Sequence, residues 1–176
     1  MEKTKQQIFL ELYKPVHGPL SRFCRAISGN TEDGKDLMND TLLASFESFE
    51  KLKDTQLFKS YVFSVACNLN KMRFRRTKFR AEFNEKELHQ IADGGKNPEQ
   101  ITEFNLIYEK ILVLPNRIAE TLFLFYLNDL SLEEIQRIQG GSLSGVKLRL
   151  KRGREKLVVL LNTPEQVKVF LMFLTY

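Results

Sequence analysis

The stretch that most constrains this chain runs from Leu130 to Leu157, and its pattern predicts two short helices separated by a glycine turn. Ser131 and Glu134 have the spacing of a capping box, which begins a helix. Gly140 and Gly141 follow that helix, and glycine tolerates the left-handed conformations that a tight turn requires. The spacing therefore predicts a helix, a turn and a second helix.

The second of these helices is strongly basic. Either Ser142 or Ser144 can cap it, and Val146 with Leu150 gives it an apolar side that faces its own domain. One acid, Glu155, stands among six cations: Lys147, Arg149, Lys151, Arg152, Arg154 and Lys156. A cationic second helix after a tight turn is typical of a helix-turn-helix, whose second helix enters the major groove of DNA. A solvated basic helix is the alternative.

Charge and length agree with a polyanionic partner without requiring one. The chain has 176 residues, 43% of them hydrophobic, with a net charge of +5. Residues 1–76 carry 13 basic and 9 acidic side chains, residues 77–105 carry 4 and 6, and residues 106–176 carry 10 and 7. Two basic parts therefore flank an acidic connector, which favours nucleic acid as a partner.

Several classes of function find no support in the sequence. Cys24 and Cys67 have no metal-ligand spacing, and His17 and His89 lie near no cysteine pair, so we expect no metal and no cofactor. Phosphate-binding glycine loops and nucleophile motifs are missing, so we expect no enzyme and no small-molecule substrate. Without a signal peptide or an apolar run long enough to span a bilayer, we expect a cytoplasmic protein that does not insert into a membrane.

Helical periodicity dominates, so the sequence predicts an all-α protein. Before the helix-turn-helix we expect helices at about 5–14, 19–27, 34–52 and 58–76, a helix start at Asn97-Pro98 and a helix boundary at Leu114-Pro115. Two buried stripes are predicted: Leu42, Phe46 and Phe49 in the third helix, and Phe58, Val62, Val65, Leu69 and Met72 in the fourth. We expect a first domain over 1–80, a flexible linker over 81–104, a second domain over 105–162 and a helical extension over 163–176, which packs on the second domain or docks on a regulator.

Two passages together resemble a known family. The first joins DLMNDTLLASFESFEKL to FKSYVFSVACNLNKMRFRR, and the second runs from Leu114-Pro115 through LFLFYLNDLSLEEIQRIQGGSLSGVKLRLKRGREKL. In this order they resemble the extracytoplasmic-function (ECF) group of sigma factors of bacterial RNA polymerase, in the sigma-70 family. The resemblance implies a region 2 domain and a region 4 domain joined by a linker, with core RNA polymerase and promoter DNA as partners.

The resemblance also implies which residues act. It implies that core polymerase is bound by a stripe that otherwise reads as a solvated face: Asp36, Asp40, Leu43 and Glu47. It assigns reading and opening of the −10 element to Asn68, Lys71, Arg73, Arg75 and Arg76, and the flipped base to the loop 53–57. Phe58, Tyr61 and Phe63 either stack on bases or belong to the core. The resemblance assigns contact with the −35 element to Ser142, Ser144, Lys147, Arg149, Lys151, Arg152 and Arg154.

Six positions depart from the usual pattern of the family, and they bear on promoter preference: Cys67, Ala119, Gln136, Gly145, Leu148 and Gly153. The resemblance further implies an anti-sigma factor as a regulator and a monomer when free. The acidic linker either occupies a basic channel of the polymerase or acts as a tether. The alternative function is a free-standing helix-turn-helix regulator, which predicts a dimer on a palindromic site.

Overall fold

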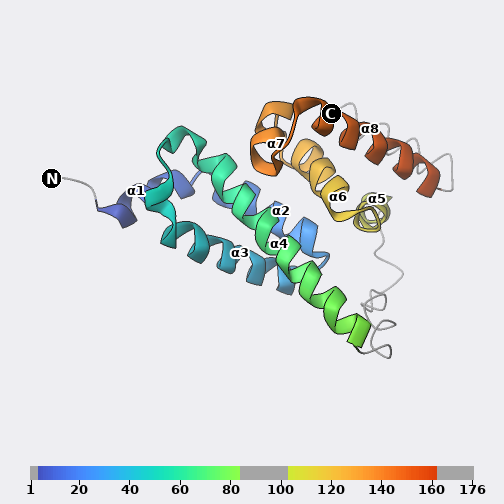
Figure 1. Ribbon diagram of the computed structural model, residues 1–176, viewed down its shortest axis with the longest axis horizontal. Coiled ribbons are helices and arrows are strands. Elements are labelled where there is room, and N and C mark those ends of the chain that lie inside the picture. Colours follow the sequence, from blue (N-terminus) through green and yellow to red (C-terminus); the bar gives the residue numbers. More distant parts are fainter. Residues whose placement is uncertain (1–3, 84–102, 162–176) are drawn as a thin grey trace.

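The computed structural model describes the backbone of residues 4–83 and 103–161, with side chains for residues 4–76 and 107–161. This part of the chain is helical and contains no strand, which confirms the all-α prediction (Figure 1). The N-terminal domain consists of α1 (Lys5–Tyr13), α2 (His17–Ser28), α3 (Thr31–Glu47), η1 (Phe49–Lys51), η2 (Thr55–Leu57) and α4 (Phe58–Phe83). The C-terminal domain consists of α5 (Glu103–Leu112), α6 (Asn116–Leu122), η4 (Phe123–Leu127), α7 (Leu132–Gln139) and α8 (Leu143–Leu160).

Two predicted features fall largely outside the described residues. The predicted linker, 81–104, is described only at residues 81–83 and 103–104, which end α4 and begin α5. The predicted extension, 163–176, and the helix start at Asn97-Pro98 lie outside the described residues altogether.

Local signals set the bounds of the N-terminal helices. Gly29 ends α2 in the left-handed conformation with φ 79°, which glycine adopts without steric cost. Asn30 then caps α3, because its side chain accepts a hydrogen bond from the backbone N–H of Asp33 at 2.8 Å. The helix therefore begins at Thr31, three residues earlier than predicted. Gly34, which we expected at its start, lies inside the helix, where a Cβ would come within 2.6 Å of the Arg25 Cα.

The core of the N-terminal domain forms where α2, α3 and α4 meet. Leu20, Phe23, Leu37, Val62 and Phe63 are all fully buried there. A cluster of aromatic rings closes the end near α1: the Phe9 ring meets the rings of Phe46, Phe49 and Phe58 edge to face, with centroids 5.2–5.3 Å apart. The buried Phe58 and Phe63 rings therefore belong to the core rather than to an exposed stacking surface.

Helix α4 is buried on two sides, whereas the sequence predicted a single buried stripe. Phe58 and Val62 are buried as expected, but Met72 is 48% exposed, and Cys67 and Asn70 are buried in addition. The second buried side exists because α4 packs against α3 on one side and against α7 of the other domain on the other (Figure 1). Helical periodicity marks one apolar face and contains no signal for a second, polar contact face.

The C-terminal domain is a compact group of helices around Leu122, Leu124, Ile135, Val146 and Leu157, all fully buried. Helix α8 crosses α6 closely at a glycine, Gly153, where a Cβ would lie 3.0 Å from Ile118 Cγ2 and Leu122 Cδ1. This departure from the family pattern therefore has a packing reason.

Candidate nucleic-acid interface

The turn before α8 is built by the residues that the sequence singled out. Ser131 and Glu134 form the predicted capping box at the start of α7. Gly140 and Gly141 adopt φ values of 71° and 88°, which glycine tolerates. The Gln136 side chain donates to the Gly141 carbonyl at 3.0 Å, so this departure from the family pattern stabilises the turn.

Helix α8 begins at its predicted cap and turns an apolar side inward. Ser142, rather than Ser144, caps it by accepting from the Gly145 N–H at 3.1 Å. Val146 and Leu150 are buried, as predicted. The exposed side carries Ser142, Ser144, Lys147, Lys151 and Arg152.

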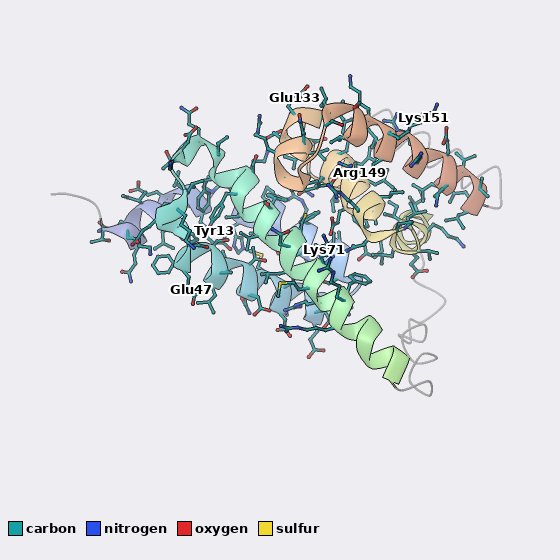
Figure 2. The ribbon with its side chains drawn as sticks, in the orientation of Figure 1. Tyr13, Glu47, Lys71, Glu133, Arg149 and Lys151 are labelled. Atoms are coloured by element: carbon teal, nitrogen blue, oxygen red, sulfur yellow. The ribbon has the colours of Figure 1, made fainter. Side chains whose placement is uncertain are left out.

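Two of the predicted DNA-contacting arginines point back into the protein instead. The Arg149 Nε donates to Gln139 Oε1 at 3.1 Å, and burial lowers the pKa of its guanidinium. The Arg154 Nε donates to the Tyr126 hydroxyl at 2.5 Å, and its guanidinium lies 5.6 Å from the centre of that ring. Figure 2 shows Lys151 on the outer side of α8, whereas Arg149 lies toward the interior.

The predicted −10 residues form a basic track on the second half of α4. Asn68, Lys71, Arg75 and Arg76 are exposed, and Arg73 is half-buried. Arg73 forms an ion pair with Asp40 of α3, which belongs to the predicted polymerase-binding stripe. The two predicted surfaces therefore share a contact that sequence patterns do not reveal.

The acidic stripe on α3 lies on the exposed side of the helix, where its Asp40 pairs with Arg73. Asp36, Asp40 and Glu47 are exposed, and Leu43 exposes 61% of its surface, which is a large fraction for a leucine. The opposite side of α3 is buried through Leu37, Met38, Thr41 and Ser45, and the Thr41 hydroxyl bonds back to the Leu37 carbonyl. Glu47 lies on the side of the molecule away from Lys151 (Figure 2).

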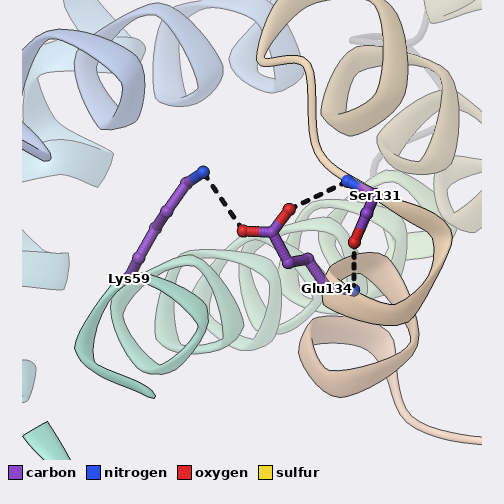
Figure 3. A network of polar contacts seen from close by, with 3 residues as sticks. All are labelled: Lys59, Ser131 and Glu134. Carbon is purple, nitrogen blue, oxygen red and sulfur yellow. Dashed lines mark hydrogen bonds and ion pairs between the residues drawn. The ribbon is translucent and has the colours of Figure 1, made fainter. Parts of the chain in front are cut away.

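The two domains contact each other through polar groups that sequence reasoning missed. Lys59 of α4 donates to Glu134 Oε1 at 3.2 Å, while Glu134 Oε2 accepts from the Ser131 N–H at 2.8 Å (Figure 3). Burial opposes ionisation of Glu134, but these donors outweigh it and hold the pKa of Glu134 below its ordinary value. One carboxylate therefore caps α7 and binds the other domain.

A second interdomain contact is deeply buried. Asn70 of α4, 3% exposed, donates to Asn116 Oδ1 at 3.2 Å and lies 3.5 Å from Glu120 Oε1. Burial raises the pKa of Glu120 to about 7, against the opposing effects of hydrogen bonds from Asn70 and Gln139. These partners are 46 and 50 residues apart in the chain, so no local pattern could have paired them.

Beside this contact lies a polar cavity of about 170 Å³ between the domains. Its walls include Asn68 and Lys71 of α4 and Arg117 and Gln139 of the C-terminal domain. Two of the side chains assigned to −10 reading by the resemblance, Asn68 and Lys71, therefore face the second domain.

The part of the chain that the structure describes contains two cysteines, and neither forms a disulfide. Cys24 and Cys67 are free and buried; burial raises the pKa of Cys24 to about 12 and that of Cys67 well above its ordinary value, so both are protonated thiols. Among the described residues, no cluster of three or more His, Cys, Asp or Glu side chains could hold a metal ion. Within the same ranges, no helix has the length and apolar character to cross a membrane.

Known proteins match the chain over both domains. The family described as Sigma-70 region 2 matches residues 12–80, and the family described as Sigma-70, region 4 matches residues 104–157. The ECF RNA polymerase sigma factor SigW of Bacillus subtilis is 27% identical over 89% of this chain and 90% of its own. The RNA polymerase sigma factor NccH of Alcaligenes xylosoxydans xylosoxydans is 27% identical over 91% of this chain and 90% of its own.

A solved structure has the same fold. The sigma factor RpoE from Bartonella quintana, crystallised in complex with the anti-sigma factor NepR, aligns with a TM-score of 0.62 at 20% identity. The alignment covers 89% of this chain and 98% of that one. Both sigma-70 regions, in this order and on this fold, place the chain in the sigma-70 family, among its ECF sigma factors.

Proposed function

We propose that this protein binds core RNA polymerase and directs it to promoters by reading a −10 element with α4 and a −35 element with α8. The observation that carries the proposal is the exposure of an acidic stripe on α3 and of basic side chains on α4 and α8. The proposed domains are residues 1–80 and 105–162. As a member of a family of transcription factors, the chain is assigned no catalytic role.

The polymerase contact is proposed for Asp36, Asp40, Leu43 and Glu47. Acidic groups give an interface its register and rate of association through charge complementarity, and one exposed leucine at the centre adds burial. Leu43 is exposed beside these acids, so a docked partner would bury its apolar side chain.

The −35 contact is proposed for the exposed side of α8. Ser142 and Ser144 lie at the helix N-terminus, where hydroxyl and backbone N–H groups bind phosphate. Lys147, Lys151 and Arg152 are exposed and can reach base edges and phosphates. In this arrangement Arg149 and Arg154 fix α8 to its domain rather than contact DNA.

Reading both elements requires the domains to move apart. Elements at −10 and −35 are roughly 25 base pairs apart, which is about 85 Å of B-DNA at about 3.4 Å per base pair. Helix α8, with its 18 residues, is only about 27 Å long, and α4 touches α7 directly. The arrangement described here is therefore proposed to be a closed form of the free protein, with Asn68 facing the second domain.

Co-elution of the purified protein with bacterial core polymerase tests the proposal. Asp40→Arg with Leu43→Glu is expected to abolish co-elution, whereas the wild type co-elutes. Glu133→Arg with Leu10→Glu is the matched control, because Leu10 is also 61% exposed and both positions lie off the stripe. A folded wild type that does not co-elute would contradict the proposal and favour the free-standing helix-turn-helix regulator.

Two further partners and states belong to the same proposal. The structural relative was crystallised with an anti-sigma factor, which supports a regulator of that kind for this chain. The free protein is proposed to be a cytoplasmic monomer that recognises two dissimilar DNA elements. A dimer bound to a palindromic site would instead support the alternative regulator.

A further inference from the structure

The described part of the molecule contains an apolar cavity of about 270 Å³ that neither proposed DNA surface uses. It lies between α2 of the N-terminal domain and α5 with η4 of the C-terminal domain. Its apolar lining is contributed mainly by the second domain: Ile107, Ile111, Leu122, Phe123 and Leu127. Cavities at domain interfaces with apolar walls and a few polar groups are typical places for small ligands.

The α2 wall adds positive charge to this apolar lining. Arg22 and Arg25 both line the cavity, and their spacing of three residues places them on one side of α2. Both are exposed, and within residues 4–76 and 107–161 neither side chain forms an ion pair with a carboxylate. A third cation, Arg154, lies over the Tyr126 ring that forms another part of the wall.

The cavity offers a bound molecule few other polar groups. The Tyr108 hydroxyl donates to the backbone carbonyls of Arg25 at 3.1 Å and Ala26 at 2.9 Å, so it already joins α2 to α5. The fitting occupant therefore has an apolar body and a single anionic head. A volume near the lower end for ligand sites selects a slim molecule over a nucleotide or a large ring system.

We propose that this cavity binds a free medium-chain fatty acid, with the acyl chain among the apolar side chains and the carboxylate at Arg22 and Arg25. Guanidinium groups match carboxylates in charge and geometry. Because the walls come from both domains, the ligand binds the closed form better than any separated form. If the proposed function holds, such a ligand reduces promoter-directed transcription by keeping the domains together.

Isothermal titration of the full chain with monomeric decanoate tests the binding directly. We expect binding that tightens about fourfold per methylene from octanoate to decanoate, the gain for burying one CH₂. Decanol and decyltrimethylammonium should bind more weakly than decanoate, because neither presents a carboxylate to the arginines.

Variants separate the charged head from the apolar chain. Arg22→Ala with Arg25→Ala removes two exposed side chains, so the protein should fold, and it should weaken decanoate binding about five- to thirtyfold while leaving decanol unchanged. Lys53→Ala with Arg137→Ala removes two exposed cations away from the cavity and should leave both affinities unchanged.

Three results would overturn the proposal: no heat with decanoate, equal binding of decanol and decanoate, or binding to phosphatidylglycerol vesicles without binding to decanoate. Titration needs neither polymerase nor DNA, so its failure is distinct from failure of the proposed function. In a transcription assay, decanoate should inhibit the wild type but not the double arginine variant at the same concentration.

Discussion

Replacing Glu120 by Gln tests whether a buried carboxylate opposes the closed, folded form. Glu120 is 5% exposed, and burial raises its pKa from 4.5 to about 7. An acid whose folded-state pKa is raised destabilises the fold only where the unfolded chain is ionised, so the cost is absent below pH 4.5. The cost grows as the pH rises from 4.5 to 7 and is constant above that range.

The magnitude follows from the size of the shift. At 1.36 kcal/mol per pKa unit, the cost is about 1 kcal/mol at pH 5 and about 3 kcal/mol at pH 8. The amide of Gln carries no charge, so it does not pay this pH-dependent cost. The unfolding free energy of Glu120→Gln, relative to that of the wild type, should therefore rise by about 2 kcal/mol from pH 5 to pH 8. Urea unfolding of both proteins at pH 5 and pH 8 measures the difference.

The matched control is Glu133→Gln, which removes an exposed carboxylate from α7. Its effect on the unfolding free energy should differ little between pH 5 and pH 8. If Glu120→Gln shifts the unfolding free energy equally at both pH values, Glu120 does not carry the buried charge, and the reasoning fails.

Three further changes have expected sizes. Ser131→Ala removes the cap of α7 and should lower the unfolding free energy by about 1 kcal/mol in urea melts. Gly153→Val places atoms against the fully buried Leu122 and should cost about 1–3 kcal/mol, whereas Val159→Ala, at an exposed position of the same helix, should cost little. Lys59→Met breaks the ion pair with Glu134 and should cost at most about 1 kcal/mol, with a smaller effect at high salt.

Local chemistry is what the sequence could predict. The capping box at Ser131, the turn at Gly140 and the cap at Ser142 are each formed by residues within five positions of their partners, and the structure has all of them. The exposed stripe on α3 follows in the same way from helical periodicity. Such features depend on neighbours in the chain and not on the way in which domains meet.

The interdomain contacts could not be predicted because their partners are distant and individually unremarkable in the sequence. Lys59 and Glu134 are 75 residues apart, and no sequence pattern indicates that Asn70 is buried. The inward direction of Arg149 depends on Gln139 across the turn, whereas a count of cations treats every arginine on α8 alike. Packing of α4 on two sides therefore decides which of its residues are exposed.

The ion pair between Asp40 and Arg73 links the proposed polymerase surface to the proposed DNA track. The pair is partly exposed, with side-chain accessibilities of 56% for Asp40 and 31% for Arg73, so it contributes at most about 1 kcal/mol. A cationic side chain of the polymerase can therefore replace Arg73 as the partner of Asp40 at little cost in free energy. Arg73 then loses its ion pair with Asp40, which makes phosphate binding by Arg73 more favourable after polymerase binding than before it.

Asp40→Asn tests this order of events in the absence of polymerase. The free variant should bind single-stranded DNA a few times more tightly than the wild type, with a steeper dependence on salt, because one more cation reaches phosphate. Asp36→Asn removes the same charge one turn earlier in α3. Because the Asp36 side chain forms no ion pair with a described residue, this variant should show a smaller increase in DNA affinity. Equal increases in fluorescence-anisotropy titrations would mean that net charge alone is responsible, and that the ion pair does not couple the two surfaces.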